Sequence, residues 1–419
     1  MANTLKFGSG QWATKKGSTL AYNDENGNFK PLPFNFERST SATRVNKQGL
    51  IEVVSNNEPR IDFTNDSKGA LLLEPSRSNL ITYSEDIESW ATSGTITKTN
   101  NVHISPDGTQ NAGTITSSAS GFDRITQTIS VSSNSTYTSS LFIKKEQTQT
   151  NYMGIGFIFT GGTTDVGYVI FDAINGVAVS ADARIDVISE VKDFGDYWQL
   201  ISTATDNGNN ISLQFNIYAT LSTNGITTGL GVSSPRTIWG IQLEQGSYAT
   251  SYIPTQGSIG TRDIESCSDA GNDQVINSTE GVFYLNVASN GLNPSFDIIT
   301  LSDGTPNNRV LFDYTSSDNQ IELYLTVGGV NILGSTPFVT DDEDFIKVAI
   351  KWKDNDCSLW LNGVKINSTS NATVYPANTL DRLNFDIGTG TNSFYGKCKD
   401  LRVYNQALTD AELQALTQI

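Results

Sequence analysis

Short runs of alternating apolar and polar residues, separated by turn residues, recur along most of this chain. In ISLQFNIYA, the side chains of Ile211, Leu213, Phe215 and Ile217 would share one face of a strand. The next turn upstream, at residues 206–210, is built from Asp, Asn and Gly, which favour reversals of the backbone. With 36 glycines among 419 residues and only 17% charged residues, the chain is predicted to be all-β.

The strand-like runs fall into two blocks, which the stretch WGIQLEQGSYATSYIPT divides. Trp239, Ile241 and Leu243 alternate with polar residues as in a half-buried strand, and Pro254 prevents further ladder pairing. We therefore expect two β-sandwiches of the jelly-roll type, joined by a polar linker. The expected boundaries are 81–253 for the first sandwich, 254–275 for the linker and 276–419 for the second.

Residues 1–80 show scattered apolar residues without a regular period, so they are expected to form an irregular N-terminal segment. One hypothesis is that this segment attaches the protein to a particle or to sister chains and becomes ordered on contact. The alternative is an irregular subdomain that packs on the following block. The side chains considered for attachment are Phe29, Phe34, Phe36, Arg38 and Arg44.

Only the end of the chain predicts a helix. Thr409 and Glu412 have the spacing of a capping box at the start of TDAELQAL, so we expect one short C-terminal helix. The three cysteines lack any Cys-x-x-Cys or Cys/His pattern, which argues against a zinc site. Free buried thiols are favoured, and Cys357 and Cys398 would pair only if their strands were neighbours.

The charge of the chain limits its partners. A net charge of −17 repels phosphate backbones and anionic lipid, so nucleic-acid binding is not expected. The N-terminus has no apolar signal-peptide core, and no run approaches the about 18 apolar residues of a membrane span. We therefore expect synthesis in a cytoplasm and no membrane insertion.

The C-terminal block resembles the concanavalin A-like, laminin-G-type jelly rolls. The resemblance rests on KVAIKWKDNDCSLWLNGVKI, with its strand–turn–strand and W-x-N-G, and on the closing strand and helix in FYGKCKDLRVYNQALTDAELQAL. It implies a second sandwich of that type. Folds of this type often hold a structural Ca²⁺, for which Asp297, Asp303 and Asp313 are the candidate ligands, although no loop matches a cation-binding consensus. No other cofactor is expected.

The rest of the chain resembles modular appendage proteins of bacteriophages, such as tail fibres and head fibres. The segments that carry this resemblance are SATRVNKQGLIEVVSNNEPRIDFTN, LLLEPSRSNLITYSEDIESW, and WGIQLEQGSYATSYIPT followed by GTRD. The first sandwich is in addition similar to carbohydrate-binding modules. The resemblance implies a virion protein made in the host bacterial cytoplasm, with capsid, portal or tail proteins as partners. It also implies a homo-oligomer, in particular a trimer.

Enzymatic function is not indicated by the sequence. The single histidine, His103, lies in a polar, turn-rich segment, and the chain has no G-x-S-x-G elbow and no phosphate-binding loop. A glycosidase would need two carboxylates close together. In the candidate strands QIELYL and LNFDIG, however, Glu322 and Asp386 each stand alone. The chain is therefore predicted not to be an enzyme.

Glycan binding is the better-supported chemistry, because an exposed aromatic ring can stack on a sugar ring. The candidates are Trp90, Tyr197, Trp198 and Trp360. For Trp198 the core is the competing interpretation because its strand carries apolar neighbours, and for Trp360 because the alternation of its hairpin also points inward. Trp90 stands at the entry to the first sandwich and would cover its edge.

Three functions remain open from the sequence. The first is a non-enzymatic virion appendage whose N-terminus anchors it and whose sandwiches bind bacterial surface glycan. The second is a head or tail decoration or collar protein, in which the same sandwiches make protein–protein contacts and bind no sugar. The third, less favoured, is a polysaccharide depolymerase.

Overall fold

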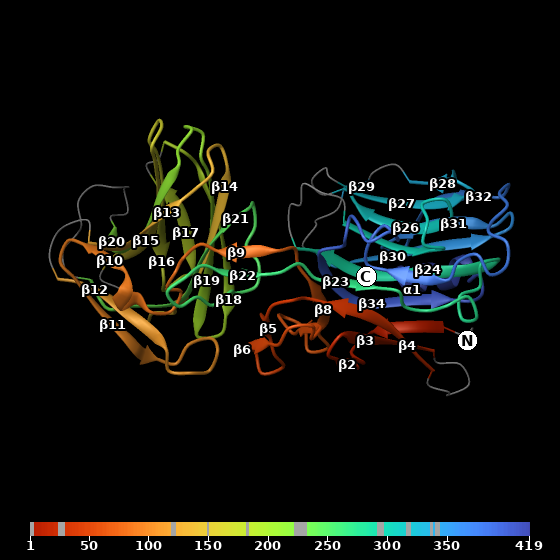
Figure 1. The fold of residues 1–419 in the computed structure, drawn as a ribbon, viewed down its shortest axis with the longest axis horizontal. Helices are drawn as coiled ribbons and strands as arrows, with labels where there is room; N and C mark the ends of the chain where they lie inside the picture. The colour runs from red at the N-terminus through yellow and green to blue at the C-terminus, as the bar shows by residue number, and fades with distance from the viewer. Residues whose placement is uncertain are drawn as a thin grey trace. The chain divides into compact units, whose positions relative to one another are not determined.

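The computed structural model describes residues 4–23, 30–118, 123–148, 151–181, 184–221, 233–290, 297–315, 320–335, 338–339 and 344–419. The chain divides into two compact units, both built almost wholly of β-strands (Figure 1). Unit 1 contains Met1–Lys47, Val53–Ser76 and Asp263–Ile419. Unit 2 contains Gln48–Glu52 and Arg77–Arg262. The predicted all-β class, with two sandwiches and one short C-terminal helix, is confirmed.

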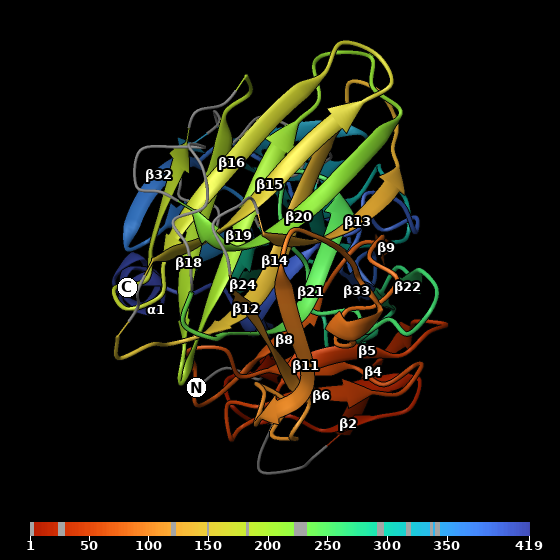
Figure 2. The same cartoon turned by 90° about the vertical axis from the view of Figure 1, so that its left-hand side faces the viewer.

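Unit 2 is a sandwich of two six-stranded sheets, with strand orders β10-β13-β20-β15-β16-β17 and β11-β12-β21-β14-β19-β18. Figure 2 shows β16, β15, β20 and β13 running side by side in the first of these sheets. Their bounds, with the smaller elements of the unit, are β9 (Arg77–Asn79), η2 (Ile87–Ser89), β10 (Ala91–Ser93), β11 (Ile96–His103), β12 (Ala112–Ser117), β13 (Arg124–Ser130), β14 (Thr136–Lys144), β15 (Tyr152–Thr160), β16 (Asp165–Asp172), β17 (Val177–Ala181), β18 (Val187–Phe194), β19 (Tyr197–Thr205), β20 (Ser212–Leu221), β21 (Arg236–Gln245) and β22 (Gly260–Arg262).

The core of unit 2 follows the alternation of its strands. On β20, Leu213, Phe215 and Ile217 lie in the buried cluster between the two sheets, as the period of two predicts. Ile211, expected on the same face, is 64% exposed because the strand begins one residue after it.

Unit 1 is a second sandwich, in which two sheets face each other across a large apolar core. The strand order is β23-β4-β3-β1-β34-β24-β30-β31-β32 in the first sheet and β28-β27-β26-β25-β33 in the second. The strands β2, β7 and β8 join the first sheet beside this path, and β29 joins the second. The bounds are β1 (Thr4–Gly8), β2 (Thr14–Lys15), β3 (Ser18–Asn23), β4 (Lys30–Glu37), β5 (Ala42–Val45), β6 (Ile51–Val54), β7 (Arg60–Asp62), β8 (Ala70–Leu73), β23 (Ser266–Ser268), β24 (Glu280–Ser289), β25 (Asp297–Ser302), β26 (Arg309–Tyr314), β27 (Gln320–Val327), β28 (Val330–Gly334), β29 (Phe338–Val339), β30 (Ile346–Lys353), β31 (Cys357–Leu361), β32 (Val364–Thr369), β33 (Arg382–Asn384), β34 (Gly396–Tyr404) and α1 (Asp410–Thr417).

The N-terminal strands complete the C-terminal sandwich. β1 pairs with β34 from Thr4 opposite Tyr404 to Gly8 opposite Asp400. The side chains of Phe34 and Phe36 lie in the same buried cluster as those of the C-terminal strands. The domain boundaries therefore differ from the expected ones, in which residues 1–80 formed a segment apart. The aperiodic apolar residues of this segment are buried by strands that follow more than 200 residues later in the chain.

A buried ionic cluster joins the early and late parts of unit 1. Arg38 Nη1 lies 2.6 Å from Glu265 Oε1, and Arg60 Nε donates to the same oxygen over 2.9 Å. Arg60 also contacts Glu74, with 2.8 Å between Nη1 and Oε2. All four side chains are buried. Arg38 therefore stabilises the interior of unit 1, and its side chain is not exposed on a surface that could attach to a partner.

The stretch that divides the two blocks folds back over its own strand in unit 2. After β21, the ring of Tyr252 packs against Trp239 with 4.6 Å between the ring centroids. Glu244 accepts a hydrogen bond of 2.9 Å from the backbone N–H of Thr250, and Gln242 accepts one of 2.7 Å from that of Ile253. The abrupt exit expected from the sequence is therefore held by the polar side chains of the strand that it leaves.

The C-terminal elements agree with the sequence. The hairpin of β30 and β31 forms, and Asn362 and Gly363 make the following turn with positive φ angles of 48° and 83°. The helix α1 has the predicted capping box of Thr409 and Glu412. It covers the outer side of the first sheet, where Leu413 packs in the small buried cluster that contains Trp360 and Tyr404.

The three cysteines, Cys267, Cys357 and Cys398, are buried free thiols. Cys357 lies on β31 and Cys398 on β34, and since β24 and β30 stand between these strands, the two are not bonded. Burial raises the pKa of all three thiols.

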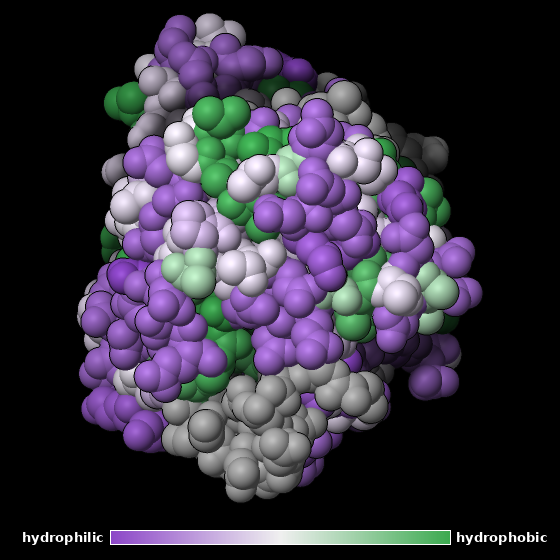
Figure 3. Space-filling view, turned by 90° about the vertical axis from the view of Figure 1, so that its right-hand side faces the viewer, coloured by the Kyte–Doolittle hydropathy of each residue, from purple (hydrophilic) through white to green (hydrophobic). Residues whose placement is uncertain are grey.

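The surface shown in Figure 3 is mostly hydrophilic, with apolar residues in small separate areas. No helix in the described part of the chain is long and apolar enough to cross a membrane.

Candidate functional site

The second sheet of unit 1 has one face in the core and one face turned away from it. On β26, Val310 and Phe312 point into the core, so Arg309, Leu311 and Asp313 point to the opposite face. On β27 the same alternation sends Glu322, Tyr324 and Thr326 to that face. We call this surface, defined by these six residues of β26 and β27, the Asp313 face.

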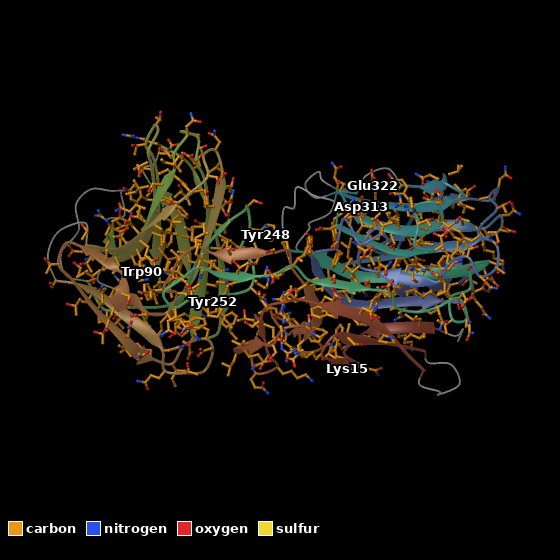
Figure 4. The ribbon with its side chains drawn as sticks, viewed as in Figure 1. Lys15, Trp90, Tyr248, Tyr252, Asp313 and Glu322 are labelled. Carbon is orange, nitrogen blue, oxygen red and sulfur yellow. The ribbon has the colours of Figure 1, made fainter. Side chains whose placement is uncertain are left out.

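The register places two carboxylates side by side on the Asp313 face. β26 and β27 are antiparallel, with Asp313 opposite Glu322 and Leu311 opposite Tyr324. Directly opposed residues in such a pair have Cβ atoms about 4.5–5.5 Å apart. Figure 4 shows Asp313 and Glu322 next to each other in unit 1.

Asp313 is a buried acid with an unmet hydrogen-bonding atom. Its side chain is only 5% exposed, and its Oδ1 has no hydrogen-bond partner within the described structure. Burial, together with the negative charges of Glu322 and Asp297, raises the pKa of Asp313 to about 8, and Arg309 offsets this only in part. At neutral pH this carboxyl therefore holds its proton.

Arg309 brings unmet donors to the same face. Its Nε and Nη1 are buried and have no hydrogen-bond partner in the part of the chain that the structure describes. Burial lowers the pKa of Arg309, while the attraction to Asp313 raises it. Arg309 and Asp313 thus attract each other, yet no hydrogen bond between the described residues joins them.

Glu322 and Tyr324 form the more exposed side of the Asp313 face. The hydroxyl of Tyr324 donates to Glu322 Oε2 over 2.5 Å, and both side chains are half-buried. The ring of Tyr324 lies over Gly334 of β28, where an added Cβ would come within 2.9 Å of the ring. The absence of a side chain at Gly334 therefore lets the ring lie close to the sheet.

Asp386 does not belong to this group of polar side chains. Its Oδ1 accepts hydrogen bonds from the backbone N–H groups of Gly388, at 2.5 Å, and Gly390, at 3.3 Å. Thr300 on β25 donates to the backbone carbonyl of Asp386 over 2.8 Å. Asp386 therefore shapes a turn that lies against β25.

The three aspartates considered for calcium are not assembled into a site. Asp297 and Asp303 lie at opposite ends of β25, and the carboxylate of Asp303 accepts from Thr305 and Asn308 in its own turn. Among the described residues, no group of three His, Cys, Asp or Glu side chains stands close enough to hold a metal ion. Of the three aspartates, Asp297 and Asp313 lie close enough for the charge of Asp297 to raise the pKa of Asp313.

Three of the four aromatic candidates for sugar stacking lie in the interior. Trp90 is 2% exposed, and its Nε1 donates to the backbone carbonyl of Tyr83 over 2.8 Å (Figure 4). Trp360 lies under α1, and the hydroxyl of Tyr197 donates to the carbonyl of Ile104 over 2.7 Å. Rings buried in this way have no free face for a sugar, so the prediction of stacking does not fit them.

Trp198 is the remaining aromatic candidate and is half-buried. The ammonium group of Lys145 lies 4.1 Å from its ring centroid, and its Nε1 donates to the carbonyl of Ala173 over 3.0 Å. Gly176 lies against the same ring, because an added Cβ there would come within 2.8 Å of it. Trp198 therefore already has partners of its own on unit 2.

The residues considered for attachment have mostly interior roles. Phe34 and Phe36 are core residues and Arg38 belongs to the buried ionic cluster, so these three do not fit an exposed docking surface. Arg44 is half-buried on β5. Phe29 lies outside the described residues.

Residues 272–414 match the family model described as the concanavalin A-like lectin/glucanases superfamily, which confirms the resemblance of the C-terminal block. The curated proteins contain no match to this chain.

Solved structures give weaker likenesses. A carbohydrate-binding module, CBM40, of the Ruminococcus gnavus IT-sialidase, bound to α2,3-sialyllactose, is 19% identical, covers 36% of this chain and 93% of its own, and has a TM-score of 0.30. Domains LG4-5 of the mouse laminin α1 chain are 8% identical, with coverage of 72% and 88% and a TM-score of 0.23. Trypanosoma rangeli sialidase is 10% identical, with coverage of 96% and 66% and a TM-score of 0.29. Likenesses of this size do not indicate what this chain binds.

Proposed function

We propose that this protein is a bacteriophage appendage protein that binds host surface glycan through the Asp313 face of unit 1. The observation that carries the glycan-binding role is a set of unmet polar atoms on one face of a lectin-like sandwich. Asp313 Oδ1 lacks a donor, while Nε and Nη1 of Arg309 lack acceptors.

Sugars suit such a pair of unmet groups. A hydroxyl group can donate one hydrogen bond and accept others at the same time, so one hydroxyl or two neighbouring ones could accept from Arg309 and donate to Asp313. Leaving buried polar atoms unpaired costs about 1–3 kcal/mol each. A ligand that satisfies them would recover part of that cost, which favours binding at this face over a neighbouring one.

The virion role rests on the resemblance of the N-terminal and junction segments to phage appendage proteins. Capsid, portal or tail proteins would be the partners, and a homotrimer is the proposed assembly. Because Phe34, Phe36 and Arg38 are interior, attachment would use other surfaces of unit 1 or unit 2. We also propose that the protein acts by binding, without catalysis.

The test is glycan binding by the full-length protein and by point variants. Deleting residues 1–80 would remove β1, β3, β4 and β8 from the sheet of unit 1. Such a deletion would therefore disrupt the fold of unit 1 and could not separate attachment to the particle from glycan binding. We would compare the wild type, Arg309→Gln and Glu322→Gln on a glycan array and on intact cells of candidate hosts. Asp273→Asn is the matched control, since Asp273 is an exposed carboxylate of the same unit.

Glycan binding by the wild type and the control, with a loss of at least tenfold in both site variants, would support the proposal. Equal binding by all four proteins would place the glycan site elsewhere. If the wild type binds no glycan but does bind purified phage particles, the protein is a decoration or collar component.

A further inference from the structure

We infer that the glycan bound by the Asp313 face carries a positively charged amino group, as an unacetylated amino sugar does. This inference rests on the proposed function and specifies its ligand.

The charges of the Asp313 face favour a cation. Asp313 and Glu322 oppose each other across β26 and β27, and the negative charges of Glu322 and Asp297 both act on Asp313. Arg309 is the cation that acts on Asp313 among the described residues, and it does not cancel the repulsion. Two carboxylates at this spacing cannot both be ionised cheaply unless a positive charge comes between them.

Asp313 also offers a place for that charge to bind. Its Oδ1 is unpartnered although the side chain is nine-tenths buried, so this acceptor is neither hydrated freely nor used by the fold. An ammonium group has three N–H donors. It can donate to Asp313 and to Glu322 at once, in charge-assisted hydrogen bonds that are about twice as strong as neutral ones.

A neutral sugar would gain less from the same face. A hydroxyl group brings no positive charge to offset the negative charge of Glu322, so Asp313 keeps its proton. A bound ammonium group supplies the positive charge that offsets Glu322. Asp313 can then ionise and release its proton to the solvent. The titratable and charged groups that surround the Asp313 carboxyl are Glu322 and Tyr324 on β27, Arg309 on β26, and Asp297 on β25. Binding should therefore release close to one proton for each ligand bound below about pH 8.

Three oligosaccharides that differ only at the C2 substituent test the inference. They are the β-1,4-linked hexamers of glucosamine, N-acetylglucosamine and glucose, which carry an ammonium, an acetamido and a hydroxyl group. Isothermal titration calorimetry at pH 6 and physiological salt would give the affinity. Repetition in two buffers with different ionisation enthalpies would give the number of protons released.

We expect the glucosamine hexamer to bind at least tenfold more tightly than the other two, with release of about one proton. Glu322→Gln and Asp313→Asn should each reduce this preference at least tenfold, and Asp313→Asn should abolish the proton release. Asp273→Asn should leave both unchanged, which separates the site from general attraction to a chain of net charge −17.

The other outcomes overturn the inference in distinguishable ways. Equal binding of the three hexamers would leave glycan binding standing and remove the requirement for a cation. A glucosamine preference that survives in Glu322→Gln and Asp313→Asn would show nonspecific attraction. Displacement of the hexamer by millimolar Ca²⁺, with Ca²⁺ binding lost in Asp313→Asn, would make the bound cation a metal ion. If no hexamer binds, the inference is wrong, and the array experiment alone decides the proposed function.

Discussion

Arg60 and Glu265 are 205 residues apart in the chain and meet in a buried, two-point ion pair. Arg60 Nε donates to Glu265 Oε1 over 2.9 Å, and Arg60 Nη2 contacts the second carboxylate oxygen. The strongly ionised guanidinium, whose pKa is raised by Glu265 and Glu74 against the effect of burial, holds β7 next to the segment that enters β23. The N-terminal strands are therefore a working part of the C-terminal sandwich.

Breaking this ion pair should destabilise unit 1 strongly. Glu265→Gln leaves the guanidinium groups of Arg38 and Arg60 buried with Glu74 as the remaining carboxylate of the cluster, and removing one partner of a buried ion pair costs about 3–5 kcal/mol. Chemical denaturation should show a lower midpoint for the transition of unit 1. Asp273→Asn should stay within about 0.5 kcal/mol of the wild type. A change below 1 kcal/mol in Glu265→Gln would contradict the importance given to the cluster.

Removing the first strands should unfold one unit and spare the other. A chain without residues 1–37 lacks β1 to β4, and with them Phe7, Phe34 and Phe36 of the buried core. Unit 2 has its own core, so one thermal transition should persist while the other is lost. Calorimetry of the full-length and shortened chains would measure both. Two intact transitions in the shortened chain would argue against the pairing of β1 with β34.

The pKa of Asp313 makes stability depend on pH. An acid whose pKa is raised to about 8 in the folded state, from 3.8 in the unfolded chain, binds its proton more tightly when folded. Its contribution to stability is therefore complete below about pH 4 and is lost as pH rises to 8, by about 1.4 kcal/mol per pH unit. Asp313→Asn should flatten this decline between pH 5 and 8. Parallel curves for the two proteins would contradict the raised pKa.

The cysteines should be inert until the protein unfolds. Cys267, Cys357 and Cys398 are buried, and burial raises the pKa of each thiol, so little reactive thiolate forms near neutral pH. A thiol reagent should label none of them in the native protein and three in denaturant. Rapid labelling of the native chain would show that the core of unit 1 opens readily.

The sequence predicted what depends on local pattern. Alternation predicted Leu213, Phe215 and Ile217 as core residues, and the Asn362-Gly363 turn and the Thr409 cap were recognisable from residue type alone. These features need no knowledge of distant segments.

The features that sequence analysis missed depend on strand pairing over long distances. Phe34 and Phe36 were considered for attachment to a partner because the C-terminal strands that bury them come more than 200 residues later. In its own strand Glu322 is the one carboxylate, and its neighbour Asp313 lies on the other strand of a hairpin. The sequence of neither strand determines the register that brings the two together. The alternation of β26 and β27 was the available signal, since it puts both carboxylates on the same side of the sheet.

Glycan binding by the Asp313 face is the central claim, and one titration tests it most directly. The wild type, Glu322→Gln and Asp273→Asn would be titrated with the tightest ligand found on the array. The account predicts that Glu322→Gln binds at least tenfold more weakly, while Asp273→Asn matches the wild type. Equal affinity of Glu322→Gln and the wild type, with both proteins folded, would contradict it.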